Sequence, residues 1–266
     1  MVKFYELVTG FRKLDLDTNR PVIAHASLSA FGEVTGGADT LLGALLANFR
    51  SLVMPAFTYK TMLTPEKGPP DNGLTYGSEK DRNLMSQFFR PDLPADRLMG
   101  IVPETLRRHP KARRSSHPIL SFTGVNAGQA LESQTLSEPL APIRLLADMQ
   151  GWVLLLGVDH TVNTSIHQAE KMAGRKQFTR WALTPRGVVE CPGFPGCSEG
   201  FQAIAPSLEQ STRRVQIGRA TIQAVPLADL IETARAWVAE DPLALLCERS
   251  YCERCCAVRK DVRVRA

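Results

Sequence analysis

This sequence lacks several features that by themselves would identify a membrane or secreted protein. No apolar run approaches the roughly 20 residues that a helix needs to cross a bilayer. The first 20 residues, MVKFYELVTGFRKLDLDTNR, lack the apolar core of a signal peptide. We therefore expect a soluble, cytoplasmic protein with no membrane partner.

The common catalytic motifs are also missing. The sequence holds no GxSxG nucleophile elbow, and no cysteine has an evident histidine partner, which argues against a serine-type hydrolase. The glycine-rich segment 25–37 matches neither the Walker A loop nor GxGxxG. The two histidines of segment 157–174 do not have the HExxH spacing of a zinc protease.

The charge balance is modest. The formal net charge is +5 and the pI about 9.0. This balance suits an anionic partner such as a phosphate, a nucleotide cofactor or nucleic acid, but it also fits a mildly basic surface without a role. Few aromatic residues interleave with the basic ones, so we do not expect nucleic acid as a partner.

The order of apolar segments predicts an α/β fold. A strand over 21–28, a helix over 40–50 and a strand over 51–57 form a strand–helix–strand unit. The run WVLLLGV (152–158) predicts a strand that is buried on both faces. We also expect three helices, over 100–110, 163–174 and 229–242. We expect a single domain over 1–266, and the 266 residues are ample for one buried core.

A long polar segment interrupts this pattern. Residues 60–84 are rich in glycine, proline and charge, and so long a loop in a compact domain is usually functional or disordered. A lid over a cleft is the functional interpretation.

Segment 157–174, GVDHTVNTSIHQAEKMAG, offers acid–base chemistry. His167 and Glu170 are three residues apart on a predicted helix, which puts both on one face. A carboxylate there could fix the tautomer of the imidazole and leave its other nitrogen as a base. The alternatives are an exposed polar pair, and a metal site that also uses Asp159 and His160.

Two further segments could hold an anion. HASLSAFGEVTGG (25–37) leads from a strand into a helix, and such backbone amides can bind phosphates. RRSSHPILS (113–121) offers two arginines and several hydroxyl groups. Taken alone, each also fits an ordinary glycine-rich turn or a solvated basic loop.

Taken together, these stretches resemble the antibiotic N-acetyltransferase family, best known for aminoglycoside 3-N-acetyltransferases and distinct from the GNAT enzymes. The resemblance runs from about residue 22 to residue 218. It rests on HASLSAFGEVTGGADTLLGAL, LVMPAF, MGIVPETLRRHPKARRSSHPILSF, GWVLLLGVDHTVNTSIHQAE and GCSEGF, in that order. The resemblance implies a central mixed sheet with helices on both faces.

The resemblance also implies an activity. Acetyl-CoA would donate an acetyl group to an amine of an aminoglycoside, or to a different amine, by direct transfer in a ternary complex. His167 would be the general base and Glu170 would orient it, with His25 as a second active-site histidine. The expected CoA-binding residues are Ser27, Leu28, Ser29, Val34, Gly36, Gly37, Arg114, Ser115, His117 and Ser121.

The acceptor site is less defined by sequence. An aminoglycoside is polycationic, so carboxylates should line its pocket, and we expect Glu104, Asp159 and Asn163 near the acceptor. Further candidate carboxylates lie in the 60–84 loop, at Glu66, Asp71, Glu79 and Asp81. A homodimer is compatible with the sequence.

The six cysteines all follow residue 190. Clustered cysteines in a cytosolic protein are more often free thiols or metal ligands than disulfides. Cys252 and Cys255 form a CxxC pair with Cys247 upstream, and Cys191 or Cys197 could complete a zinc site. Free thiols in a Cys-rich C-terminal cap are the alternative. We expect no metal in the catalytic site and no catalytic cysteine.

Overall fold

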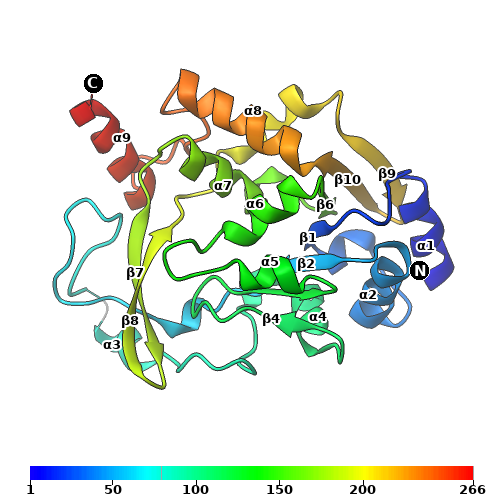
Figure 1. The fold of residues 1–266 in the computed structure, drawn as a ribbon, viewed down its shortest axis with the longest axis horizontal. Coiled ribbons are helices and arrows are strands. Elements are labelled where there is room, and N and C mark those ends of the chain that lie inside the picture. Colours follow the sequence, from blue (N-terminus) through cyan, green and yellow to red (C-terminus); the bar gives the residue numbers. More distant parts are fainter. Residues whose placement is uncertain (79, 266) are drawn as a thin grey trace.

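The computed structural model describes residues 1–78 and 80–265, as a twisted sheet with helices on both faces (Figure 1). The helices are α1 (Phe4–Arg12), α2 (Gly37–Asn48), α3 (Lys80–Leu84), α4 (Ile101–Arg108), α5 (Gly128–Glu132), α6 (Ala141–Asp148), α7 (Ser165–Met172), α8 (Leu227–Glu240) and α9 (Glu253–Arg265). The strands are β1 (Val22–Ala26), β2 (Leu52–Pro55), β3 (Met62–Leu63), β4 (Arg113–Arg114), β5 (Phe122–Val125), β6 (Trp152–Leu156), β7 (Phe178–Thr184), β8 (Gly187–Phe194), β9 (Arg213–Ile217) and β10 (Ala220–Pro226). Short 3-10 turns η1 (Leu28–Phe31), η4 (His160–Val162) and η5 (Phe201–Leu208) also bear on the site.

The main sheet has seven strands in the order β4-β5-β2-β1-β6-β10-β9. Its centre is parallel, with β1 pairing to both β2 and β6, and its outer pairs are antiparallel. The predicted α/β fold with a central mixed sheet is therefore confirmed.

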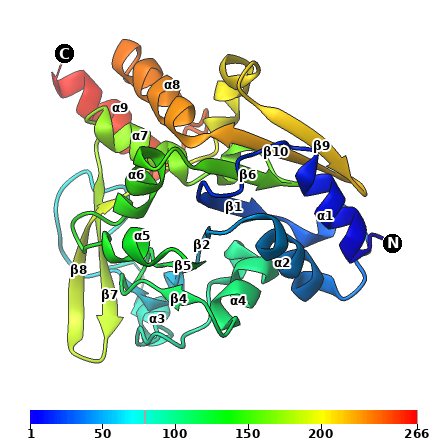
Figure 2. The same cartoon turned by 45° about the vertical axis from the view of Figure 1, so that its right-hand side comes forward.

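Alternate residues of the central strands feed two separate cores. Ile23, Val153 and Leu155 pack with α6, α7 and α8 on one face, whereas Ala24 and Leu154 pack with α1, α2 and α4 on the other. Figure 2 shows the two helical layers on opposite sides of the sheet. Burial on both faces explains why WVLLL has no polar position, as predicted.

A second, three-stranded antiparallel sheet, β3-β7-β8, was not predicted. The 60–84 segment supplies its edge strand β3 and then packs beside β7, where the Asn72 amide bonds to both backbone groups of Thr179. The segment also contacts α9 through an ion pair between Asp71 and Lys260 at 2.7 Å. It therefore lies beside the hairpin and the C-terminal helix (Figure 1). Glu79, one of its candidate carboxylates, lies outside the described residues.

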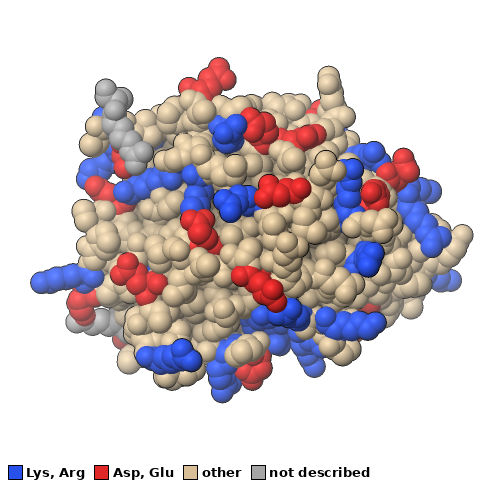
Figure 3. Space-filling model, in the orientation of Figure 1, with Lys and Arg blue, Asp and Glu red and all other residues tan. Residues whose placement is uncertain are grey.

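Charged residues intermingle over the face seen in Figure 3, where basic and acidic side chains lie side by side. In the described part of the chain, no helix combines the length and apolar character needed to cross a membrane.

Candidate active site

A cavity of about 600 Å³ opens at the carboxyl ends of β1 and β6. Because these two strands run parallel, with His25 opposite Leu155, both end at the same edge of the sheet, where α/β proteins place their clefts. At the end of β6, Gly157 has φ +66° and lies so close to Ala30 that a Cβ would collide with it. This close approach lets the turn after β6 pack against the turn after β1.

The cavity brings together most of the residues that were predicted in segment 25–37. Those that line it are His25, Ser27, Leu28, Ser29, Val34 and Gly37. Gly36 lies beside Gly37 as the N-cap of α2, with φ 75°. The cavity is also lined by residues 98–101, Pro103, Val158, Val162 and Thr164, which places segment 157–174 on the same cavity.

His25 is a buried histidine with an unused nitrogen. Its Nε2 has no hydrogen-bond partner within the described part of the chain, although its residue lines the cavity. Burial, reinforced by the nearby His160, lowers the pKa of His25 to about 3. His25 is therefore neutral at physiological pH and can donate or accept a hydrogen bond, but it is too weak a base to hold an amine proton.

His167 and Glu170 form the predicted pair. The Nδ1 of His167 lies 2.6 Å from Oε2 of Glu170, and the two side chains are 8% and 1% exposed. Since both are buried, the surface-pair alternative is wrong.

Gly174, with φ +77°, follows α7 and donates its N–H to the carbonyl of Lys171, as its position after the helix suggests.

Arg175 extends this pair into a chain of three. Its Nη1 lies 2.5 Å from the other carboxylate oxygen of Glu170, and its side chain is only 2% exposed. Its Nη2 donates to the carbonyl oxygens of Pro242 and Ala244, which follow α8. A cation beside the carboxylate compensates its burial and fixes its orientation.

The imidazole of His167 is also held from the side. The Phe201 ring, at the start of η5, meets it edge-on at 4.7 Å between ring centroids. His167 itself is not among the residues that line the cavity, but Thr164, whose carbonyl accepts the His167 N–H, forms part of the wall. His167 thus follows a residue of the cavity wall by about one helical turn along the chain.

The expected acceptor residues after β6 have local partners. Asp159 is exposed and caps η4 by accepting from the Thr161 backbone N–H and hydroxyl. Asn163 is fully buried, with its Oδ1 bound to the Ser165 N–H and its Nδ2 at 3.2 Å from Nδ1 of His160. Burial lowers the pKa of His160 to about 4. A metal site with Asp159, His160, His167 and Glu170 is not assembled, because His167 and Glu170 bond to each other and His160 to Asn163.

Segment 114–121 is more buried than the sequence suggested. The Arg114 guanidinium donates to the carbonyls of Ala56, Pro91 and Leu93 and to Oγ of Ser121, and burial lowers its pKa to about 10. Ser115 bonds to the backbone of Phe122. Cofactor contact by these three predicted side chains stays a prediction, and it would require these internal bonds to rearrange.

His117 lies at a different cavity, of about 490 Å³, which also includes Phe89 and Arg186. Its Nδ1 accepts from the Ile119 and Leu120 backbone N–H groups, and burial lowers its pKa to about 4. The structure therefore does not bring His117 to the cavity that holds His25.

Glu104 has partners within its own helix and loop. Its carboxylate binds Arg107 through two hydrogen bonds, at 2.7 and 2.8 Å, and accepts from the Ala95 N–H. Partial burial opposes its ionisation, but these donors outweigh burial and hold the pKa of Glu104 below its usual value. An acceptor role for Glu104 stays a prediction.

Sequence reasoning missed Arg175 and the contact of Phe201 with His167. Arg175 follows Gly174, which ends the helix, and nothing in the local sequence predicts its ion pair with Glu170. Phe201 stands in the quoted GCSEGF motif, but only the fold shows which ring it meets.

Comparison with known proteins identifies the family of this chain. A family model described as aminoglycoside 3-N-acetyltransferase matches residues 23–239. Aminoglycoside N(3)-acetyltransferase III of Salmonella is 27% identical over 229 residues, which are 75% of this chain and 77% of that protein. Aminoglycoside N(3)-acetyltransferase IX of Micromonospora chalcea is 34% identical over 168 residues, 60% of this chain and 58% of that protein.

Solved structures match the whole fold. The apoenzyme of aminoglycoside acetyltransferase AAC(3)-IVa superimposes with a TM-score of 0.79 and 26% identity, over 97% of each chain. A histidine-to-alanine variant of the same enzyme in complex with a gentamicin matches with a TM-score of 0.78 and 25% identity, again over 97% of each chain. The chain therefore belongs to the aminoglycoside 3-N-acetyltransferase family of acetyl-CoA-dependent enzymes.

Proposed function

We propose that this enzyme transfers the acetyl group of acetyl-CoA to an amino group, of the 3-N type, on an aminoglycoside. Transfer is direct, within a ternary complex, and His167 is the general base. The observation that carries the proposal is the buried chain Arg175–Glu170–His167, which follows a wall residue of the cavity that is lined by the family's motif residues.

An ammonium group cannot attack a thioester, so the acceptor must lose a proton. Glu170 accepts from Nδ1 of His167, which leaves Nε2 with a lone pair for that proton. The carboxylate then stabilises the imidazolium, and Arg175 keeps the carboxylate in place. General-base catalysis of this kind contributes roughly 100- to 10,000-fold.

A second group must stabilise the oxyanion of the tetrahedral intermediate. The N–H of Ser27, just after β1, bonds to the Leu156 carbonyl and is therefore occupied. The neutral His25, with its unpartnered Nε2, and the Leu28 amide are the remaining candidates. Holding both substrates in one cleft supplies much of the remaining rate.

The aminoglycoside class of the acceptor rests on the relatives. Family members carry this activity in their names, and AAC(3)-IVa has been solved with a gentamicin and with apramycin. Asp159 is the exposed carboxylate nearest to α7 in sequence and is our candidate contact for an acceptor ammonium group. A non-aminoglycoside amine is the alternative acceptor within the same family.

The test is release of CoA thiol from acetyl-CoA, followed with a thiol reagent against a broad aminoglycoside panel. We expect release that depends on the aminoglycoside, acetylation of the 3-amino group by NMR of the product, and a kcat that is lower by about 100-fold or more in His167→Ala. His109→Ala is the matched control, since this half-exposed histidine lies outside the site and should keep full activity.

Each part of the proposal has its own contrary result. No release with any aminoglycoside would refute the substrate assignment, even if CoA still binds. Wild-type kcat in His167→Ala would refute the assignment of the base. Parallel initial-velocity lines, or a burst of thiol without acceptor, would refute direct transfer in favour of an acyl-enzyme.

A further inference from the structure

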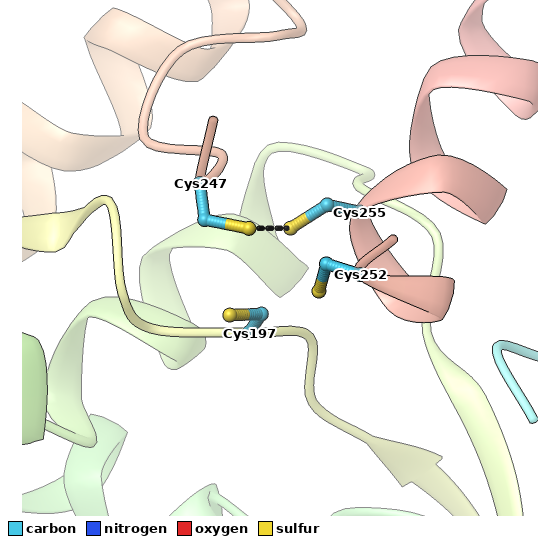
Figure 4. A group of neighbouring side chains, drawn as sticks. All are labelled: Cys197, Cys247, Cys252 and Cys255. Carbon is cyan, nitrogen blue, oxygen red and sulfur yellow. Dashed lines mark hydrogen bonds between the residues drawn. The ribbon is translucent and has the colours of Figure 1, made fainter. Parts of the chain in front are cut away.

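Four cysteines from three separate segments meet beside the C-terminal helix (Figure 4). Cys197 lies in the loop between β8 and η5, Cys247 in the connection after α8, and Cys252 and Cys255 at the start of α9. Two cysteines stay outside this group: Cys191 is buried in β8, and Cys256 is exposed with its Sγ bonded to the Ser250 carbonyl.

The spacing of the sulfur atoms matches a tetrahedral metal site. All four Sγ atoms lie within 4.8 Å of one another, and those of Cys247 and Cys255 are 3.4 Å apart. Four sulfurs at about 2.3 Å from a zinc ion would be separated by about 3.8 Å along each edge of the tetrahedron. The separations therefore need to change by about 1 Å or less. A disulfide, in contrast, needs sulfurs at about 2.05 Å.

Most of this cysteine cluster is shielded from solvent. Cys197, Cys247 and Cys255 are buried, with exposed fractions of 7, 4 and 1%. A buried set of four sulfurs is typical of a structural metal site rather than of reactive surface thiols.

We propose that Cys197, Cys247, Cys252 and Cys255 bind one zinc ion as a structural tetrathiolate site. Four protein ligands fill the coordination sphere of zinc and leave no position for substrate, so the ion has no catalytic role. This site goes beyond the acetyl transfer proposed above and does not depend on it. Of the two candidates to complete the CxxC group, Cys197 does so and Cys191 does not.

Nearby arginines moderate the net charge of such a site, which would be −2 with four thiolates. Arg254, between the CxxC cysteines, donates to the Gly196 carbonyl next to Cys197. Arg259, one turn farther along α9, donates to the Cys247 carbonyl. Both arginines bind the segments that carry the ligands, so they place positive charge near the sulfurs and hold the same three segments together.

The zinc ion would also fix two segments that position His167, the candidate base. Phe201, which packs on His167, follows Cys197 by four residues, and the carbonyls of Pro242 and Ala244, which bind Arg175, precede Cys247 in the same connection. Gly200 packs directly on that connection, because a Cβ there would lie 2.6 Å from the Leu245 and Leu246 carbonyl oxygens. One tetrahedral site thus fixes both segments relative to α9.

The test is elemental analysis of the full-length protein, purified under reducing conditions without added metal or metal-affinity resin. We expect about one zinc ion per chain in the wild type and in Cys256→Ser, the matched control, and loss of most of it in Cys252→Ser. Cys252 is the least buried of the four, so this variant should disturb packing least.

A second measurement on the wild type keeps the test valid if Cys252→Ser fails to fold. Titration of the folded protein with an organomercurial should release about one zinc ion to a chromogenic chelator, and cobalt exchange should produce the visible absorption of a tetrahedral thiolate site. A wild type without zinc, an intramolecular disulfide between two of these cysteines, bound iron in place of zinc, or full zinc content in folded Cys252→Ser would each overturn the proposal.

Discussion

The Arg175→Met substitution tests whether the buried arginine serves His167 through Glu170. Methionine is unbranched and fills part of the space of the arginine stem, but it removes the charge. Glu170, whose side chain is 1% exposed, would then keep only His167 as a partner. The carbonyls of Pro242 and Ala244 would lose the same donor.

The expected loss of stability is large because the pair is buried. Removal of one partner from a buried ion pair costs about 3–5 kcal/mol, since it leaves an uncompensated charge. For a domain of this size, about 2–4 °C of Tm corresponds to each kcal/mol, so Tm should fall by about 6–20 °C. A misplaced imidazole should lower kcat by about 10- to 100-fold.

Circular dichroism melts and the thiol-release assay, run below the Tm of every variant, measure the two effects. Arg235→Met is the control, because Arg235 pairs with Glu232 on the exposed surface of α8 and should change neither quantity. The double variant Glu170→Gln/Arg175→Met removes both charges. It should recover part of the lost stability, because no unpaired charge remains, but not the lost kcat.

Separate results would refute the two parts of this reasoning. A Tm of Arg175→Met within about 2 °C of the wild type would show that the ion pair does not support the fold. A wild-type kcat in the same variant would show that Arg175 does not position His167. Recovery of kcat in the double variant would show that the carboxylate of Glu170 is not needed by the base.

Three further predictions concern stability and the cofactor. Burial lowers the folded-state pKa of three histidines from 6.5 to about 3, 4 and 4, for His25, His117 and His160. The unfolded state therefore binds more protons than the folded state below pH 6.5. The free energy of unfolding should fall as pH drops from 6.5 towards 4, by up to about 1.4 kcal/mol per pH unit for each histidine. Equal urea midpoints at pH 7 and pH 5 would contradict this prediction. Gly200→Ala should lower the Tm, because the added Cβ would meet two backbone carbonyls. Gly196→Ala should leave the Tm unchanged, because its Cβ would meet nothing within 4 Å. Identical Tm values for the two variants would refute the packing argument. Val34→Trp should raise the KM for acetyl-CoA by about tenfold or more, since it fills the cavity, with little effect on the KM for the aminoglycoside; the reverse pattern in initial-rate kinetics would move the cofactor to another site.

The sequence determined the fold class and the central strands. The all-apolar WVLLL run predicted a strand buried on both faces, and alternate residues do enter two separate cores. The helical spacing of His167 and Glu170 predicted their pairing, because residues three apart share a helical face whatever surrounds the helix. The order of the motifs was enough to recognise the family.

Only the tertiary structure decided which polar groups face the cavity and which face the interior. Arg114 and Ser121, which the sequence offers as cofactor ligands, both donate to the Ala56 carbonyl in the fold, because that acceptor would otherwise be buried without these donors. Their contact with CoA stays a prediction.

The roles of Arg175 and Cys197 also depended on the tertiary structure, because their partners are distant in sequence. Each meets partners that lie about 50 or more residues away along the chain, Pro242 in one case and Cys247 in the other. Local periodicity carries no information on such contacts, because it reports only which face of one element is apolar. The sequence thus predicted the His167–Glu170 pair and the CxxC group. Only the packing of the chain showed that Arg175 joins the pair and that Cys197 is the fourth cysteine of the proposed zinc site.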